Sequence, residues 1–290
     1  MHMLYLWHIY HKEGDIMATK KSVSVKKTTA KKAVTKRPAT RANSKAAITG
    51  IGGHITASLQ SVKLWKSLGA EFIGTFLLAS IFIVGQGQPI FILFGMAGIV
   101  LMLGAISGAY VNPALTVAAW VTRRMGWLRT VAYIVAQLLG GIVSFFTLKT
   151  FLAGAPSPDA EAISFGANAP ELFSALPLVN IEGKEWYVFF AEVLGTAILA
   201  FAFAYALRAL RAKDTIGAAF SAGFGIFIAL MIGITVAGYV SASSILNPAV
   251  AISLQAFDAS FWSYAMYALG PIVGAVVGFG LYDLLKNEKA

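Results

Sequence analysis

Long apolar runs separated by short polar segments occupy most of the chain from residue 67 onward. Six of these runs approach the ~20 residues that a helix needs to cross a bilayer. They lie at about 67–86, 88–108, 130–149, 186–207, 216–238 and 260–282. Two further apolar segments, 112–122 and 247–257, are too short to cross, because a helix of ten residues is only ~15 Å long. The pattern predicts an all-α membrane protein with six transmembrane helices and two half-length helices.

The apolar body consists of two related halves. The segment AEFIGT at 70–75 in the first span matches AEVLGT at 191–196 in the fourth. Likewise, the Asn-Pro-Ala sequence at 112–114 matches the one at 247–249. Each half contains three full spans, an odd number, so the second half must cross the membrane upside down relative to the first. The sequence therefore predicts an inverted 3+3 repeat, in which the two short helices enter the membrane from opposite faces.

The composition agrees with a membrane protein and excludes other classes. The chain is 58% hydrophobic and 12% charged, with a mean hydropathy of +0.72, whereas soluble domains are about a quarter charged. This excludes an ordinary soluble globule and a disordered chain. Cysteine is absent, so there is no disulfide, thiolate metal site or cysteine nucleophile. Because His-Glu-x-x-His, a phosphate-binding loop and a paired acid site are also missing, we predict neither an enzyme nor a cofactor.

Repeats and composition divide the chain into six segments. They are residues 1–16, interpreted as an upstream extension, a basic tail (17–62), the first repeat (63–150), a connecting loop (151–185), the second repeat (186–285) and a C-terminal tail (286–290). Met17 precedes a lysine-rich run and resembles a natural start. His2, His8 and His11 in the extension have no acidic partner nearby, so we predict no metal site there.

Most of the net charge of +10 comes from the tail. Residues 17–48 are rich in Lys, Thr, Ala and Ser without a hydrophobic period, so we expect this segment to be disordered. The favoured interpretation is a solvated tail that only fixes the topology. Contact with anionic lipid headgroups is the second interpretation, and binding to nucleic acid is the least favoured.

Loop charges predict the orientation in the membrane, because short cytoplasmic loops are enriched in Lys and Arg. The basic residues gather in the loops after the second and fourth spans: Arg123, Arg124, Arg129, Arg208, Arg211 and Lys213. The loop between the third and fourth spans instead carries acids and a single lysine, Lys184. Placing the basic segments inside puts both termini in the cytoplasm, and we expect a plasma or inner membrane.

The two Asn-Pro-Ala sequences carry the strongest functional signal. Asn is a favoured N-cap and Pro is favoured at the first helical position. Each half-helix should therefore begin at its motif, which comprises Asn112, Pro113 and Ala114 in the first half and Asn247, Pro248 and Ala249 in the second. Two positive helix N-termini then meet near the midplane. The non-helical loops before them must be buried or line a wet cavity.

A pore follows from this arrangement, with the two Asn amides as central donors. Loop carbonyls are the predicted acceptors, namely those of Gly108, Ala109, Tyr110, Ser243 and Ile245. A permeating water would turn its oxygen toward both amides, which interrupts a proton-conducting wire, and the two helix ends would repel cations.

These residues resemble the aquaporin or major intrinsic protein family. The resemblance covers about 67–282 and rests on the paired AExxGT segments, SGAYVNPA at 107–114, LNPA at 246–249 and GPIVGA at 270–275. It implies an aquaporin-like fold of six tilted helices and two half-helices, a homotetramer with one pore per subunit, and passive flux of water or small neutral solutes. It also implies that Glu71 and Glu192 accept hydrogen bonds from the half-helix loops rather than carry protons.

The predicted selectivity filter departs from the family pattern. Carried over by spacing from the two Asn residues, its four positions fall at Ile92, Thr235, Ser244 and Val250. Water-selective members have Arg where this chain has Val250, and His where it has Thr235. We therefore expect a wider, uncharged filter that passes urea, ammonia or hydrogen peroxide and opposes cations less. Ala251 replaces the Asp that glycerol facilitators carry at this position. The alternatives to a channel for water and small solutes are a glycerol-type facilitator and a structural or ion-leaky member.

Overall fold

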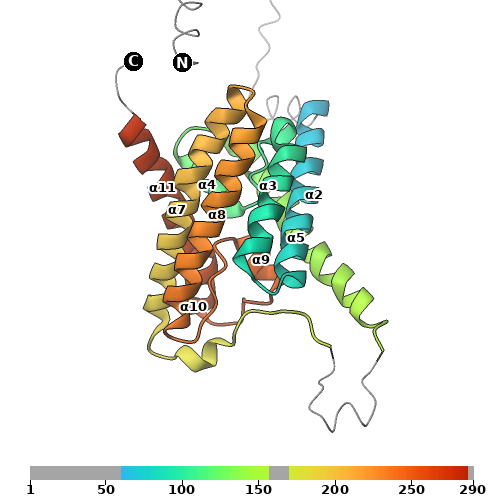
Figure 1. The fold of residues 1–290 in the computed structure, drawn as a ribbon, viewed down its shortest axis with the longest axis vertical. Coiled ribbons are helices and arrows are strands. Elements are labelled where there is room, and N and C mark those ends of the chain that lie inside the picture. Colours follow the sequence, from blue (N-terminus) through green and yellow to red (C-terminus); the bar gives the residue numbers. More distant parts are fainter. Residues whose placement is uncertain (1–59, 157–169, 287–290) are drawn as a thin grey trace, which may run out of the picture. The chain divides into compact units, whose positions relative to one another are not determined.

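The computed structural model describes residues 60–156 and 170–286. The interpreted extension, nearly all of the basic tail, part of the connecting loop and the last four residues lie outside these ranges. The described elements are α2 (Val62–Val84), α3 (Pro89–Ser107), α4 (Pro113–Val121), α5 (Trp127–Leu152), the 3₁₀ turn η1 (Leu178–Ile181), α7 (Glu185–Arg211), α8 (Thr215–Gly238), α9 (Pro248–Ser253), α10 (Phe261–Tyr264), the π-helical turn η2 (Ala265–Leu269) and α11 (Gly270–Lys286). Within the described ranges the chain is a helical bundle without strands (Figure 1).

Six of the described helical segments are long and apolar enough to cross a membrane: α2, α3, α5, α7, α8 and the continuous segment Phe261–Lys286. This confirms the predicted number of spans. The sixth span contains the π-helical turn just before Pro271. Proline has no N–H to donate, so the helix widens locally at the preceding turn instead of keeping its regular ladder.

The packing of the helices follows the predicted repeat. In the first half α2 packs on α3 and α5, and in the second half α7 packs on α8 and α11. The half-helices cross over, because α4 lies against α11 of the second half and α9 lies against α5 of the first half. Each half therefore completes the other, which is the arrangement that an inverted repeat requires.

The two short helices are half-length, but the second is shorter than predicted. The segment expected at 112–122 forms α4, whereas the segment expected at 247–257 forms a helix only as far as Ser253. The chain turns after that residue, since Gln255 has a left-handed φ of 55° and the N–H of Ala256 donates back to the carbonyl of Ala251. A left-handed residue of this kind ends a helix.

Close approach between helices depends on glycines that face neighbouring backbone. A Cβ added at Gly274 of α11 would lie 2.2 Å from the carbonyl oxygen of Val193, and one at Gly141 of α5 would lie 2.3 Å from that of Ala249. Small residues at such positions let membrane helices pack by direct backbone contact. The second contact matters for the site, because it seats α9 against α5.

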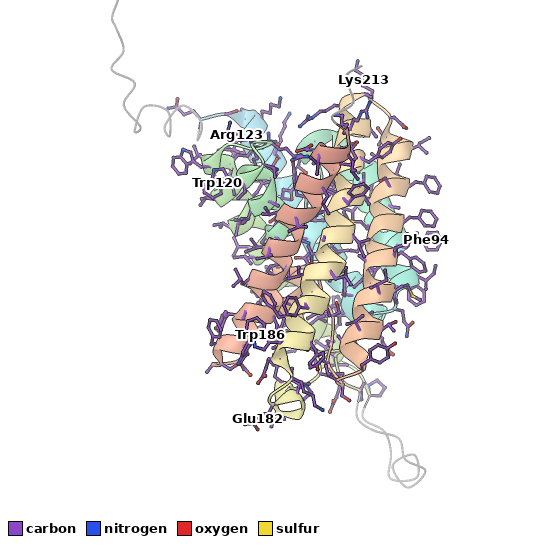
Figure 2. The ribbon with its side chains drawn as sticks, turned by 90° about the vertical axis from the view of Figure 1, so that its left-hand side faces the viewer. Phe94, Trp120, Arg123, Glu182, Trp186 and Lys213 are labelled. Atoms are coloured by element: carbon purple, nitrogen blue, oxygen red, sulfur yellow. The ribbon has the colours of Figure 1, made fainter. Side chains whose placement is uncertain are left out.

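The ends of the bundle differ in charge, and its outer surface is apolar. Figure 2 shows Arg123 and Lys213 at one end, Glu182 at the other, and Phe94 pointing outward between them. The end formed by residues 122–126 and 208–214 is called the arginine end below, and the end formed by residues 85–88 and 170–184 is called the loop end. Exposed Phe, Leu, Ile and Val side chains cover the helices between the two ends. Such a surface fits contact with lipid.

Candidate pore

Two asparagines start the half-helices by the same local geometry. Asn112 and Asn247 both have extended backbone, and each is followed by Pro at the first helical position. The Asn112 Oδ1 accepts from the N–H of Ala114 at 2.8 Å, and the Asn247 Oδ1 accepts from that of Ala249 at 3.0 Å. Both helices therefore begin where their capping residues predict.

The same two side chains join the halves at the centre of the bundle. The Nδ2 of Asn112 donates to the carbonyl oxygen of Leu246 at 2.9 Å, and the Nδ2 of Asn247 donates to that of Val111, also at 2.9 Å. Each asparagine thus holds the carbonyl that directly precedes the other asparagine. The exchange brings together two helix N-termini, each of which carries about half a positive charge.

The residues before each asparagine adopt strained backbone. Val111 has a φ of 43° and Leu246 a φ of 62°, in the left-handed region that side chains disfavour. Strain of this kind costs about 1–3 kcal/mol and clusters at functional sites. Here it turns the two carbonyls toward the centre, where the Asn amides bind them.

Two buried glutamates hold these loops in place. Glu71 on α2 accepts from the N–H groups of Tyr110 at 3.1 Å and Val111 at 2.8 Å. Glu192 on α7 accepts from those of Ile245 at 2.6 Å and Leu246 at 2.8 Å. Carboxylate acceptors make the stronger kind of hydrogen bond, which offsets the strain. These contacts are the ones that the family resemblance implied.

Further supporting residues escaped the sequence analysis. Gln137 on α5 donates to Glu71 at 2.7 Å and to the Thr116 hydroxyl at 2.9 Å. Tyr133 donates its hydroxyl to the carbonyl of Ser107 at 3.0 Å, and Tyr267 donates to that of Ser243 at 3.3 Å. The two tyrosines lie at nearly the same distance along the chain after each asparagine, so aligning the repeats would have revealed the pair.

The predicted pore carbonyls are only partly those that the structure brings to the centre. The carbonyls that meet the Asn amides belong to Val111 and Leu246, which the sequence analysis did not name. The carbonyl of Ser243 instead accepts from Tyr267. The other predicted carbonyls precede Val111 and Leu246 in the same loops, at Gly108, Ala109, Tyr110 and Ile245.

Two cavities border the re-entrant loops, one at each end of the bundle. The cavity at the loop end has a volume of about 280 Å³, and its polar side chains are Gln86, Gln88, Ser174, Ser243 and Ser244. The cavity at the arginine end has a volume of about 250 Å³ and borders Ser107, Gly108 and Tyr110. These loop residues lead directly to the asparagine pair, so the pair separates the two cavities.

Three of the four predicted filter residues face inward. Ser244 lines the loop-end cavity. Ile92 and Val250 are fully buried and border neither cavity, so their part in a filter stays a prediction.

The prediction for Thr235 is wrong. Its side chain is exposed on the outer face of α8, on the same stripe as Phe224, Ile228 and Met231, and its hydroxyl bonds to the carbonyl of Met231. The residue of this turn that lines the loop-end cavity is Ile234. The spacing carried over from the family therefore misses by one residue, and one residue rotates a helical side chain by about 100°.

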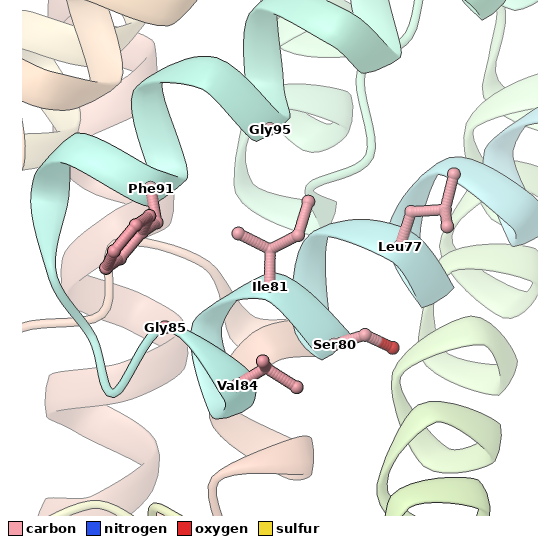
Figure 3. A pocket seen from close by; sticks show the side chains of 7 residues that line it. All are labelled: Leu77, Ser80, Ile81, Val84, Gly85, Phe91 and Gly95. Carbon is pink, nitrogen blue, oxygen red and sulfur yellow. The ribbon is translucent and has the colours of Figure 1, made fainter.

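A larger cavity lies away from the asparagine pair. It has a volume of about 430 Å³ and is formed by α2 and α3, with Leu77, Ile81 and Phe91 among its lining side chains (Figure 3). Its lining is almost entirely apolar, with Ser80 as the exception. Ser80 is already bonded to Ser144 at 2.9 Å and to the carbonyl of Phe76 at 2.8 Å. This groove therefore lacks the polar groups that a water path requires.

Among the described residues, no group of three or more His, Asp or Glu is placed to hold a metal.

Comparison with known proteins gives a consistent result. The sequence profile described as Major intrinsic protein matches residues 58–282. Aquaporin NIP3-1 of Oryza sativa subsp. japonica is 30% identical over 242 residues, covering 78% of this chain and 70% of that protein. Aquaporin AqpM of Methanothermobacter marburgensis is 32% identical over 206 residues, covering 67% and 74%. The X-ray structure of the aquaglyceroporin from Plasmodium falciparum matches with a TM-score of 0.56 at 22% identity, covering 76% of this chain and 96% of that one. This last likeness concerns the fold alone.

Proposed function

The chain belongs to the major intrinsic protein family, a family of membrane channels, and on that premise we propose that it passes water and small neutral solutes between its two half-helices. The solutes we propose are urea, ammonia and hydrogen peroxide. The single observation that carries the proposal is the reciprocal hydrogen bonding of Asn112 and Asn247 with the carbonyls of Leu246 and Val111.

The asparagine pair supplies the central step of permeation. Each side-chain NH₂ group has two hydrogens, and the opposite loop takes one of them. The second hydrogen is the donor that we assign to the oxygen of a passing water. A water held in this way by Asn112 and Asn247 points its own hydrogens away from the centre, so protons cannot be relayed through it. The two helix N-termini add a positive potential that repels cations.

Neutral solutes other than water are favoured by the chemistry of the loop-end cavity. Its lining combines Gln and Ser side chains with apolar ones, and none of its lining residues is charged. Val250 stands where water-selective relatives carry Arg. A mouth without a fixed guanidinium is wider and has no charged donor, so it discriminates less between water and a solute such as urea. A glycerol-type facilitator is the alternative, and Ala251 disfavours it.

Orientation and assembly follow from the same premise. We propose that the arginine end faces the cytoplasm, because basic loops stay inside. We further propose a homotetramer with one pore per subunit in a plasma or inner membrane. The basic tail, residues 17–62, then lies in the cytoplasm, solvated or against anionic lipid.

Stopped-flow light scattering on liposomes that contain the full chain tests this function. The osmolytes are sucrose, urea and glycerol, and the variants are Val250→Arg and the uncharged, longer Val250→Met. We expect fast water and urea flux in the original chain, and a loss of urea flux greater than the loss of water flux in Val250→Arg. Val250→Met narrows the filter without adding a charge, so comparing it with Val250→Arg separates the effect of width from the effect of charge. Urea exclusion by the original chain would contradict the proposed filter, and glycerol flux as fast as urea flux would favour the alternative.

A further inference from the structure

The cavity at the arginine end has a basic lining, in contrast to the uncharged cavity at the loop end. Three guanidinium groups line it, and they come from three elements: Arg124 follows α4, Arg129 lies in the first turn of α5 and Arg211 ends α7. The same cavity reaches Ser107 and Tyr110 of the first re-entrant loop. The three charges therefore surround the path by which a solute would approach the asparagine pair from this end.

Two of these arginines are held in place by specific contacts. Arg129 bonds to the hydroxyls of Tyr133 and Ser67, and its guanidinium lies 4.9 Å from the ring centroid of Tyr133. Arg124 pairs with Asp283 at 2.6 Å and lies 4.5 Å from the ring centroid of Phe279. Contacts of this kind fix the direction of a long side chain, so the charges stay at the mouth.

The positive charge of this mouth is largely uncompensated. The ion pair of Arg124 with the half-exposed Asp283 is the only salt bridge among the described residues. Arg129 and Arg211 thus have no acidic partner in the described part of the chain. A cleft lined by one sign of charge focuses its field and repels ions of that sign.

We infer that this chain places its charged cation barrier at the arginine end instead of the loop end, with Arg129 and Arg211 as specificity-determining residues. The inference rests on the proposed channel function and deepens it. The filter position at Val250 carries no charge, so we assign no positive group to the pore between the loop end and the half-helix N-termini at its centre. At the arginine end a cation must instead pass the guanidinium groups that line the cavity before it reaches the half-helices, while water and neutral solutes are not affected.

The test measures cation leak and water flux on the same liposomes, which contain the full-length chain. The variants are Arg211→Gln alone and Arg129→Gln with Arg211→Gln. We expect the double variant to raise the K⁺ leak about fourfold, because one unit charge on the order of 8 Å away in water alters ion partitioning by about a factor of two and two charges are removed. Arg211→Gln alone should raise it about twofold. Osmotic water permeability should stay within about a factor of two in both.

Two controls separate this electrostatic role from a structural one. Arg208→Gln removes an exposed charge one turn earlier on α7 that does not line the cavity, and it should leave the leak unchanged. Arg129→Lys with Arg211→Lys keeps the charge but changes the shape, and it should restore a low leak. An unchanged leak in both Gln variants with intact water flux would overturn the inference. A leak from Arg208→Gln, or from the double Lys variant, that is as high as the leak of the double Gln variant would also overturn it. Absence of water flux in the original chain would instead refute the proposed function.

Discussion

Replacing Gly141 by alanine should displace the second half-helix and weaken the channel. An added Cβ would lie 2.3 Å from the carbonyl oxygen of Ala249 and 3.1 Å from the Oγ of Ser253. The nearer atom is backbone, so it cannot move away without moving α9. The Ser253 hydroxyl also donates to the carbonyl of Gly141 at 2.9 Å, so a hydrogen bond already joins α9 to α5 at this glycine.

The size of the effect follows from the distances. Ordinary contact begins at 3.4 Å, so α5 and α9 must separate by about 1 Å to admit the methyl group. Overpacking of this kind costs about 1–3 kcal/mol, and the better helix propensity of Ala returns up to about 1 kcal/mol. From the middle of the overpacking range, about 2 kcal/mol, this leaves a net loss of about 1–2 kcal/mol, which lowers the melting temperature by about 2–8 °C in a chain of this size. The same shift would stretch the 2.9 Å bond from Asn247 to Val111 beyond hydrogen-bond length.

The assay combines melting in detergent, followed by tryptophan fluorescence, with stopped-flow water flux in liposomes. Gly98→Ala on α3 is the matched control, because a Cβ there meets nothing within 4 Å. We expect Gly141→Ala to melt earlier and conduct less water per inserted chain, and Gly98→Ala to do neither. Equal melting and equal water flux in the two variants would refute the close contact between α5 and α9.

Three further substitutions test individual parts of the site. Thr235→Ala should leave urea and water flux unchanged in liposomes, because the side chain faces outward; altered selectivity would return this residue to the filter. Tyr267→Phe removes the bond to Ser243 and should lower the free energy of unfolding by about 0.5–1.5 kcal/mol, seen as earlier melting. An unchanged melting curve would show that this bond adds nothing. Gln137→Leu removes a donor from the buried Glu71 and should cost about 1–3 kcal/mol in a melting experiment, with water flux reduced; a stable, fully active variant would contradict the network.

The parts of the site that sequence predicts well are those set by local chemistry. Asn112 and Asn247 start their helices because an N-cap depends on the next few residues only. The odd number of spans in each half then fixes their opposite directions without any knowledge of packing. The approximate bounds of the six spans could likewise be found from apolar runs alone, because hydropathy is a property of each segment by itself.

The parts that were missed depend on contacts between distant segments. Gln137 supports Glu71 from another helix, and nothing in its neighbourhood along the chain marks it as polar support. Thr235 was misplaced because spacing borrowed from relatives carries no information on helical register in this chain. A shift of one residue was enough to exchange the inward position with Ile234.

The most direct test of the channel assignment is the osmotic water permeability of the purified, full-length chain in liposomes, measured together with the decay of an imposed proton gradient. We predict shrinkage in sucrose that is clearly faster than in empty liposomes prepared alongside, with a proton gradient that decays no faster than in those empty liposomes. Correctly inserted protein that shrinks no faster than empty liposomes would contradict it, and so would water flux accompanied by rapid collapse of the proton gradient.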